Sequence, residues 1–489
     1  MGMTKAPYVL WNAGAAAAAT EGDAIGEWQA TGVSIDTRSL MPGDLFIAIK
    51  GVATDGHDHA RAALEKGAAG VVVRRGFTGI PADAPGVRVD DTMQALEGLG
   101  RAARDRSRAK ICAVTGSVGK TGSKDALAMI LARKGEVHAS KGNLNNHWGL
   151  PLSLARLPIE ATSAVFEMGM NHPGEIRPLS QMARPHVALI TTVELVHSEY
   201  FRSVEEIADA KAEIFDGLIA GGTAVLNRDN PMFDRLSAAA RNAGAGQVIS
   251  FGLHEAADVR ATETRPDALG TGVLADVAGT ALRYRVGVPG RHWVLNTLGV
   301  LAAAKAMGAD PVVAAAMLAR LAPPKGRGNR LAILFAGGEL TLIDESYNAS
   351  PVAVTAAIEV LGMSEPAKGG RRIAVLGDML ELGDTSDDMH RALAAPLAQR
   401  HIDAVFTAGP GMGNLFDELP REMRGGHAET SDKLAPLVAS AVRPGDVILV
   451  KGSFGSRMGA VVDALTALAD AQADHHHEHR GRGRAVNGE

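Results

Sequence analysis

The stretch Thr115-Gly116-Ser117-Val118-Gly119-Lys120-Thr121 decides the fold class of this 489-residue chain. It follows the apolar run Ile111-Cys112-Ala113-Val114, which predicts a buried strand, and it precedes a predicted helix that begins near Ser123. Glycines let the N–H groups of such a loop turn toward phosphate oxygens, and the helix N-terminus favours their negative charge. In this setting Lys120 reaches the terminal phosphates and the Thr121 hydroxyl helps to hold Mg²⁺. The sequence therefore predicts an ATP-binding phosphate loop in an α/β domain.

Apolar runs on both sides of the loop predict three α/β domains and a polar tail. The runs after the loop lack strict alternation, as in a parallel sheet that is covered on both faces. A proline and glycine cluster at 323–328 predicts a boundary, and the histidine-rich tail favours disorder over binding of a transition metal. The expected bounds are 1–107, 108–323 for the central parallel-sheet ATPase domain, 324–470 for a Rossmann-like domain and 471–489 for the tail. The predicted strands contain LFIAI, GVVV, VRV, ICAVTG, AVFEMG, VALITTV, TAVLNRD, QVISFG, LTLIDES, RIAVLGD, DAVFTAG and DVILVKG.

Composition and charge narrow the class of protein. The apolar share of 46% and the charged share of 21% are ordinary for a soluble globular protein. A net charge of −5 gives no reason to expect a nucleic-acid partner, and no run of ~18 apolar residues predicts a membrane span. The single cysteine, Cys112, lies in an apolar run and favours a buried structural thiol in a reducing compartment. We therefore expect a cytoplasmic protein without a nucleic-acid or membrane partner. We also expect it to be a monomer.

Three side chains outside the loop occupy positions where an open α/β sheet binds its ligands. Glu167 ends the strand AVFEMG, His197 follows the strand VALITTV, and Lys211 lies on a predicted helix shortly afterwards. Taken alone, each residue is more typical of a protein surface or a helix cap than of a ligand site. Because Glu167 and His197 both follow strands on the phosphate-loop side of the sheet, a metal-binding role and a structural role both stay open.

These features, together with motifs along nearly the whole chain, resemble the ATP-dependent Mur ligases of peptidoglycan synthesis. Their phosphate loop has the form TG-[ST]-x-GKT, so Val114 matches the family where other phosphate loops have a glycine. The resemblance implies an ATP- and Mg²⁺-dependent amide ligase that joins D-alanyl-D-alanine to UDP-N-acetylmuramoyl-tripeptide through an acyl phosphate. It implies that the first domain anchors the UDP-sugar and the third brings the dipeptide. The matching segments are VSIDTRSLMPGDLFIAIKG, KGNLNNHWGLPLSL, FEMGMNHPGEI, VLNRDNP, GRH-x₃-N, DESYNASP, VLGDMLELG and LVKGS.

The resemblance also implies roles for individual residues. It assigns catalytic roles to Lys120, Glu167, His197 and Lys211, and the last three match the family's metal ligands together with Thr121. Lys211 matches a lysine that reacts with CO₂, and a carbamate is an anionic oxygen donor suited to Mg²⁺, whereas an ammonium group would repel the ion. The nucleotide contacts beyond the loop are expected at Asn296, Asn329, Arg330, Asp344, Tyr347 and Asn348, with Lys451 adding a charge. The UDP-sugar contacts are expected at Ser34, Thr37, Arg38 and Ser39, and the contacts to the peptide stem at Asn145 and Asn146.

Three other functions remain as alternatives. A sibling ligase that adds a diamino acid would carry a DNPR-type motif, which the sequence lacks. Folylpolyglutamate synthase shares the loop chemistry but lacks the UDP-sugar segment of the first domain. A nucleotide-gated binding module without catalysis would have no need for Lys120, Glu167, His197 and Lys211 together.

Overall fold

The computed structural model describes residues 8–51, 54–142, 144–195, 200–267, 269–323 and 326–469. The chain forms two compact units, of which the first contains Met1–Val193, Val204–Arg260 and Leu298–Ala314, and the second contains the remainder. The predicted tail at 471–489 and His197 lie outside the described residues. Among the helices that are described, none is long and apolar enough to cross a membrane.

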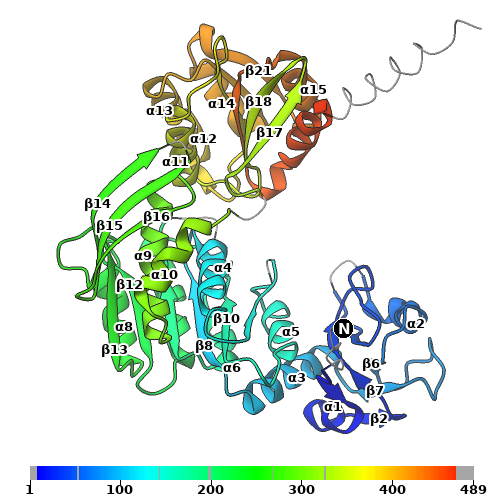
Figure 1. The fold of residues 1–489 in the computed structure, drawn as a ribbon. Helices are drawn as coiled ribbons and strands as arrows, with labels where there is room; N and C mark the ends of the chain where they lie inside the picture. Colours follow the sequence, from blue (N-terminus) through cyan, green and yellow to red (C-terminus); the bar gives the residue numbers. More distant parts are fainter. Residues whose placement is uncertain are drawn as a thin grey trace, which may run out of the picture. The chain divides into compact units, whose positions relative to one another are not determined.

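The amino-terminal domain is a five-stranded sheet whose two faces are both covered (Figure 1). Within β5 (Asp44–Ile47), Leu45 and Ile47 face one apolar cluster with α1 (Ala13–Thr20) and α3 (Thr92–Arg106), whereas Phe46 faces a second cluster with α2 (Ala60–Glu65). This double burial explains why the strands lack a polar side. The sheet order is β2 (Asp23–Ile25), β7 (Gly86–Val89), β6 (Gly70–Arg74), β5 (Asp44–Ile47) and β4 (Gly32–Ser34). A two-stranded sheet joins β1 (Trp11–Asn12) to β3 (Gln29–Ala30), and the helices are α1 (Ala13–Thr20), η1 (Gly56–His59), α2 (Ala60–Glu65) and α3 (Thr92–Arg106).

The central domain is a parallel sheet with the phosphate-loop strand β8 (Lys110–Thr115) in its middle. On one side of β8 lie β10 (Ser163–Glu167) and β9 (Val137–Ala139). On the other side lie β11 (Val187–Ile190), β12 (Thr223–Asn227), β13 (Gln247–Gly252) and the start of β14 (Val259–Asp267). After β8 the chain adds β9 and β10 on one side of this strand and then crosses to β11 on its other side. This change of side creates the switch point where open α/β sheets bind ligands.

The helices of the central domain are α4 (Lys120–Leu131), α5 (Gly149–Ala155), α6 (Ile176–Ala183), α7 (Val204–Ala212), η2 (Glu213–Gly217), α8 (Phe233–Asn242), α9 (Arg291–Ala306) and α10 (Pro311–Met317). The helices from α4 to α8 connect these strands, whereas α9 and α10 follow later in the chain, between β16 (Ala281–Val286) and β17 (Asn329–Phe335). Cys112 on β8 is fully buried, and burial raises the pKa of its thiol to about 12. The expectation of a structural thiol is therefore confirmed.

The second unit contains a hairpin and a six-stranded sheet. The hairpin pairs β15 (Gly270–Val277) with β16 (Ala281–Val286) in antiparallel register, and η3 (Leu318–Arg320) follows α10. The sheet order is β17 (Asn329–Phe335), β18 (Gly338–Glu345), β22 (Val447–Lys451), β19 (Arg372–Gly377), β20 (Ala404–Ala408) and β21 (Arg424–Ala428). Only β17 runs antiparallel to its neighbour among the pairs of this sheet that are described.

Successive residues on β22 point into two separate apolar cores. Val447 and Leu449 pack with α11 (Pro351–Gly362), α13 (Ala394–Gln399) and α14 (Pro410–Glu418). Ile448 and Val450 pack with α15 (Ser431–Ala441) and the helix at 459–469. Figure 1 shows this sheet with helices on both sides. The remaining elements are α11 (Pro351–Gly362), η4 (Gly383–Thr385), α12 (Ser386–Arg391), α13 (Ala394–Gln399), α14 (Pro410–Glu418), η5 (Arg421–Met423), α15 (Ser431–Ala441) and η6 (Phe454–Ser456).

All twelve predicted strand sequences overlap strands of the structure, and the α/β class with a parallel sheet around the phosphate loop is confirmed. One boundary differs in the central domain, because α4 begins at Lys120 and not near Ser123. The last residues of the phosphate-loop motif thus form the first helical turn, which directs their N–H groups toward the end of the helix.

Candidate active site

The phosphate loop joins the end of β8 to the start of α4, as the sequence predicts. Gly119 precedes the first helical residue with φ of 89°, a left-handed conformation that glycine adopts without strain. The Lys120 ammonium donates hydrogen bonds to the carbonyl oxygens of Gly116 at 2.6 Å and Ser117 at 3.4 Å. Thr121 is buried in the first turn of α4. A cation and a helix N-terminus therefore occupy the carboxyl end of the central strand.

Thr191 fixes this loop from the neighbouring strand. Its hydroxyl donates a hydrogen bond to the carbonyl oxygen of Val118 at 2.6 Å, and its N–H donates to the carbonyl oxygen of Thr115 at 3.0 Å. The Ser117 N–H donates to the carbonyl oxygen of Thr192 at 2.9 Å. The residues that follow β11 therefore hold the loop in its turned shape.

We expect the Gly116→Ala variant to weaken ADP binding at least about tenfold, because 1–3 kcal/mol of backbone strain would disturb the loop. Gly116 has φ of 146°, and an added Cβ would lie 1.9 Å from the Thr191 hydroxyl oxygen. Isothermal titration calorimetry with ADP measures the effect. The matched control is Gly221→Ala, since Gly221 also has a positive φ but its Cβ would meet open space. Equal ADP affinity in both variants would contradict the role given to Thr191.

Glu167 lies at the end of β10, directly beside the phosphate-loop strand. Its Cα pairs with that of Val114, and its side chain is buried. Asn145 donates an amide hydrogen bond to Glu167 Oε1 at 2.8 Å, and the Glu167 N–H donates to the Ser140 hydroxyl at 3.0 Å. The second carboxylate oxygen, Oε2, is buried and has no hydrogen-bond partner among the described residues. A buried acceptor in this state is suited to a cation.

Lys211 lies on α7, as predicted, and is buried, with only 3% of its surface exposed. Burial, followed by repulsion from Lys120, holds the pKa of the Lys211 ammonium well below its usual range. The physical environment therefore favours a neutral amine at this position.

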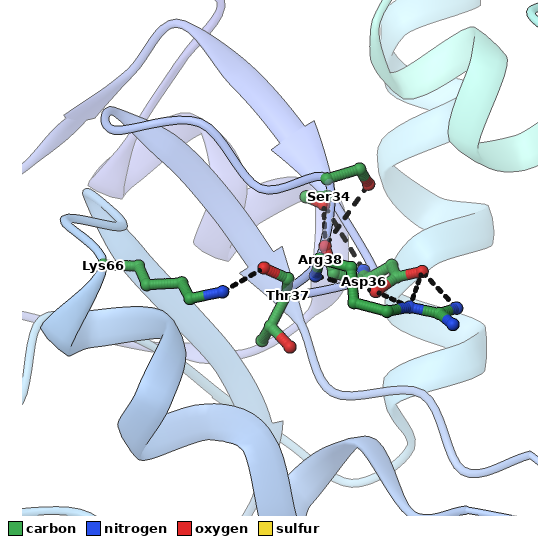
Figure 2. Close-up of polar contacts among 6 residues, drawn as sticks. Ser34, Asp36, Thr37, Arg38 and Lys66 are labelled. Carbon is green, nitrogen blue, oxygen red and sulfur yellow. Dashed lines mark hydrogen bonds and ion pairs between the residues drawn. The ribbon is translucent and has the colours of Figure 1, made fainter. Parts of the chain in front are cut away.

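The amino-terminal residues expected to bind the UDP-sugar lie at the end of β4 and in the turn that follows it, and Asp36 organises this turn (Figure 2). The Asp36 carboxylate accepts hydrogen bonds from the Arg38 N–H at 2.9 Å and from its guanidinium at 2.7 Å. The bond from the Arg38 side chain is the largest cause that lowers the pKa of Asp36. The Ser39 N–H and the Ser34 hydroxyl donate to the Asp36 carbonyl oxygen, and Lys66 donates to that of Thr37 at 2.8 Å.

The predicted nucleotide residues of the second unit lie mainly at the end of β18 and beside it. Asn329 and Asp344 are paired across the β17–β18 ladder, and Asp344 accepts hydrogen bonds from the Ser346 N–H and hydroxyl. Arg330 donates to the Ser364 hydroxyl at 2.7 Å. Asn296 lies apart from these residues in the sequence, on α9.

The loop after β18 is fixed by a buried lysine. Lys451 donates to Glu345 Oε2 at 3.1 Å and to the Asn348 carbonyl oxygen at 2.9 Å. Tyr347 lies under the Arg327 guanidinium, 4.3 Å from the ring centroid. Lys451 therefore shapes the loop that carries Tyr347 and Asn348.

Several residues at these sites were not predicted. Thr191 and Ser140 fix the phosphate loop and Glu167, and Asp36 and Lys66 fix the amino-terminal turn. The threonine pair after the strand VALI is a signal that could have indicated Thr191, because open α/β sheets bind their ligands at the carboxyl ends of strands. His292, from the GRH-x₃-N motif, lines a small cavity with Arg330 and Glu345, and its Nδ1 has no partner within the described residues.

No group of three or more histidine, cysteine, aspartate or glutamate side chains forms a metal-binding cluster within the described ranges. The metal ligands predicted from the sequence would not form a cluster of this type, because only two of the four are histidine, cysteine, aspartate or glutamate. They are Glu167, a threonine, a lysine and His197, and the last of these lies outside the described residues.

Models of three protein domains match the chain in order. They are the Mur ligase family catalytic domain at residues 29–104, the Mur ligase middle domain at 114–304 and the Mur ligase glutamate ligase domain at 326–454. The middle-domain match begins at the last residue before the phosphate-loop stretch and includes Glu167 and Lys211.

The chain is also similar to single proteins over most of its length. It is 34% identical to the UDP-N-acetylmuramoyl-tripeptide–D-alanyl-D-alanine ligase of Bacillus subtilis, over 89% of this chain and 93% of the relative. A crystal structure of MurF from Acinetobacter baumannii is 29% identical and superposes with a TM-score of 0.81, over 93% of this chain and 98% of that one. A structure of the MurF ligase from Thermotoga maritima in complex with ADP is 26% identical with a TM-score of 0.73, over 90% and 98%.

Proposed function

Because the chain belongs to the Mur ligase family, we propose that it joins D-alanyl-D-alanine to UDP-N-acetylmuramoyl-tripeptide with hydrolysis of ATP to ADP and phosphate. The similarity to ligases of this specificity extends across all three domains, and this observation carries the proposal. The relative from Thermotoga maritima was crystallised with ADP, which agrees with an ATP-dependent reaction at the phosphate loop. The activity belongs to the synthesis of peptidoglycan precursors.

The residues around the phosphate loop fit a magnesium ion. Glu167 Oε2 is a buried carboxylate oxygen without a partner among the described residues, and Thr121 supplies a hydroxyl on the first turn of α4. Mg²⁺ prefers oxygen donors of this kind together with phosphate oxygens. We propose that Thr121, Glu167, His197 and a modified Lys211 hold the ion, which when bound offsets negative charge on the phosphates.

The burial of Lys211 supports its conversion to a carbamate. A neutral amine can attack CO₂ to form an N–C bond and release one proton, which leaves an anionic carbamate. This product places an anionic group near Lys120, where the cationic form of the same side chain would be repelled. Its oxygens are also the donors that Mg²⁺ prefers.

The tripeptide carboxylate is a poor electrophile, so the proposed reaction first activates it and then forms the amide bond. A carboxylate oxygen of the tripeptide attacks the γ-phosphorus, the bond to the bridging oxygen of ADP breaks, and an acyl phosphate forms. The dipeptide amine then attacks the acyl carbon and phosphate leaves, with loss of a proton from the amine. Lys120 stabilises the charge on the transferring phosphoryl group, while the fixed loop around Gly116 orients it.

The amino-terminal turn supports the proposed binding of the UDP-sugar. Arg38 is 89% exposed in its side chain yet is held by Asp36, so its position is fixed while its outer surface is free to meet a ligand. Guanidinium groups and hydroxyls bind diphosphates well. We propose Ser34, Thr37, Arg38 and Ser39 as these contacts.

We expect the Asp36→Ala variant to raise the KM for the UDP-linked substrate about tenfold, the cost of one hydrogen bond of ~1.4 kcal/mol. The kcat is expected to stay unchanged, because the turn binds substrate and does not contact the reacting atoms. Initial rates over a range of UDP-substrate concentrations measure both constants. The control is Asp83→Ala, which removes an exposed carboxylate of the same domain. A fall in kcat alone would contradict the proposal.

Phosphate release with three substrate sets, and with ATP alone, distinguishes the functions considered. We expect ATP turnover with UDP-muramoyl-tripeptide and D-alanyl-D-alanine only. Turnover with UDP-muramoyl-dipeptide and a diamino acid, or with folate and glutamate, would identify another ligase. Nucleotide binding without turnover in any set would identify a binding module.

We further propose a cytoplasmic monomer. A single buried thiol is consistent with a reducing compartment, and the proposed reaction needs only small-molecule partners. Size-exclusion chromatography with light scattering measures the mass, and a mass of two chains would overturn the monomer.

A further inference from the structure

The Glu167 carboxylate is held asymmetrically by its surroundings. Oε1 accepts a hydrogen bond from the Asn145 amide at 2.8 Å, whereas Oε2 is buried and has no partner among the described residues. An amide that donates to one oxygen limits rotation about the last side-chain bond. The direction of the second oxygen is therefore set by a residue 22 positions away in the sequence.

Asn145 is itself anchored to the same strand end. Its carbonyl oxygen accepts a hydrogen bond from the Gly169 N–H at 2.8 Å, two residues beyond Glu167. A Cβ at Gly169 would lie 3.0 Å from the Asn145 side-chain carbonyl carbon, so glycine permits this close approach. Backbone and side chain of Asn145 thus both bind the segment that carries the carboxylate.

A second buried contact fixes the backbone of Glu167. Its N–H donates to the Ser140 hydroxyl at 3.0 Å, and the Ser140 carbonyl oxygen accepts a hydrogen bond from Lys124 at 2.8 Å. Ser140, Lys124 and Glu167 are each no more than 3% exposed. Since Lys124 lies on α4, this path connects Glu167 to the helix that begins at the phosphate loop.

We propose that Asn145 is a positioning residue for the cation site, which holds Glu167 so that Oε2 alone is presented to the metal ion. Ser140 supports the same arrangement from the backbone. The inference rests on the proposed metal site and gives Asn145 a role other than contact with the peptide stem. Partners of a metal-binding carboxylate commonly change metal affinity 10- to 100-fold when they are removed.

Electron paramagnetic resonance of Mn²⁺ bound together with a non-hydrolysable ATP analogue tests this inference without turnover. We expect Asn145→Ala to weaken Mn²⁺ binding about 10- to 100-fold. Asn145→Leu, which keeps much of the side-chain volume but has no N–H donor, is expected to behave in the same way. Ser140→Ala is expected to weaken Mn²⁺ binding less, since the carboxylate keeps its amide partner. Asn242→Ala, which removes an exposed amide at the end of α8, serves as the control and is expected to bind Mn²⁺ as the unaltered chain does.

Each remaining outcome has a distinct meaning. Normal Mn²⁺ affinity in folded Asn145→Ala and Asn145→Leu, with a raised KM for UDP-muramoyl-tripeptide, would overturn the positioning role and identify Asn145 as a substrate contact. Normal Mn²⁺ affinity in Glu167→Gln would instead overturn the proposed metal site itself. Circular dichroism and thermal unfolding confirm that each variant is folded before Mn²⁺ is added.

Discussion

The Lys120→Ala variant is expected to lose about 10³-fold in kcat/KM, or ~4 kcal/mol of transition-state stabilisation. Lys120 lies at the first turn of α4, and its ammonium already points at the loop carbonyl oxygens, 2.6 Å from that of Gly116. When phosphates fill the loop, the same ammonium is the cation available to offset the charge of the transferring group. Phosphate release at saturating ATP, with both acceptor substrates present, measures the loss.

A matched lysine separates this effect from a general loss of charge. Lys433 is exposed on α15 and pairs with Glu429, so Lys433→Ala removes a cation without touching the loop. Surface pairs of this kind contribute little to stability, ~0–1 kcal/mol. We expect unaltered rates in Lys433→Ala. A loss below tenfold in Lys120→Ala would contradict the proposed phosphoryl-transfer role.

The Lys211→Ala variant is expected to lose about 10²- to 10³-fold in kcat/KM, because it removes a preorganised anionic group from the charged centre of the site. Added short carboxylates such as formate and acetate are expected to restore part of the rate. Alanine leaves a space where the buried side chain was, and a carboxylate can supply the oxygens that the carbamate would provide. Rates measured against carboxylate concentration test both statements.

Two controls make the carbamate itself observable. Incubation with ¹³CO₂ is expected to give one carbamate carbon signal by NMR in the unaltered chain and none in Lys211→Ala. Lys368→Ala, which removes an exposed lysine, is expected to keep both the signal and the rate. Full activity of Lys211→Ala would remove the carbamate from the mechanism.

The parallel strands could be predicted from the sequence because burial on both faces leaves an uninterrupted apolar run. In β10 all five residues are buried, and the apolar run ends at Glu167. A carboxylate at the end of such a run indicates a candidate ligand position in the sequence. The hairpin β15–β16 was not predicted. In β15 buried residues, among them Val273, Ala275 and Val277, alternate with partly exposed ones. The glycine and polar residues between the buried positions make this stretch of sequence resemble a loop.

The burial and the hydrogen bonds that position the site residues could not be predicted, because they depend on contacts between segments that are distant in the sequence. Lys211 lies in ADAKAEIF, where a lysine usually faces solvent, and only the packing of α7 makes it buried. The hydrogen bond from Asn145 to Glu167 depends on the approach of a loop to the end of β10. Family resemblance indicated that both residues matter, but their geometry requires the folded chain.

Transfer of an oxygen isotope tests acyl-phosphate formation most directly. UDP-N-acetylmuramoyl-tripeptide labelled with ¹⁸O in its terminal carboxylate would be incubated with ATP, Mg²⁺ and D-alanyl-D-alanine, and the products analysed by mass spectrometry. We predict that the UDP-linked pentapeptide forms and that one ¹⁸O atom appears in each inorganic phosphate released. Pentapeptide formed together with unlabelled phosphate would contradict activation of the carboxylate through an acyl phosphate.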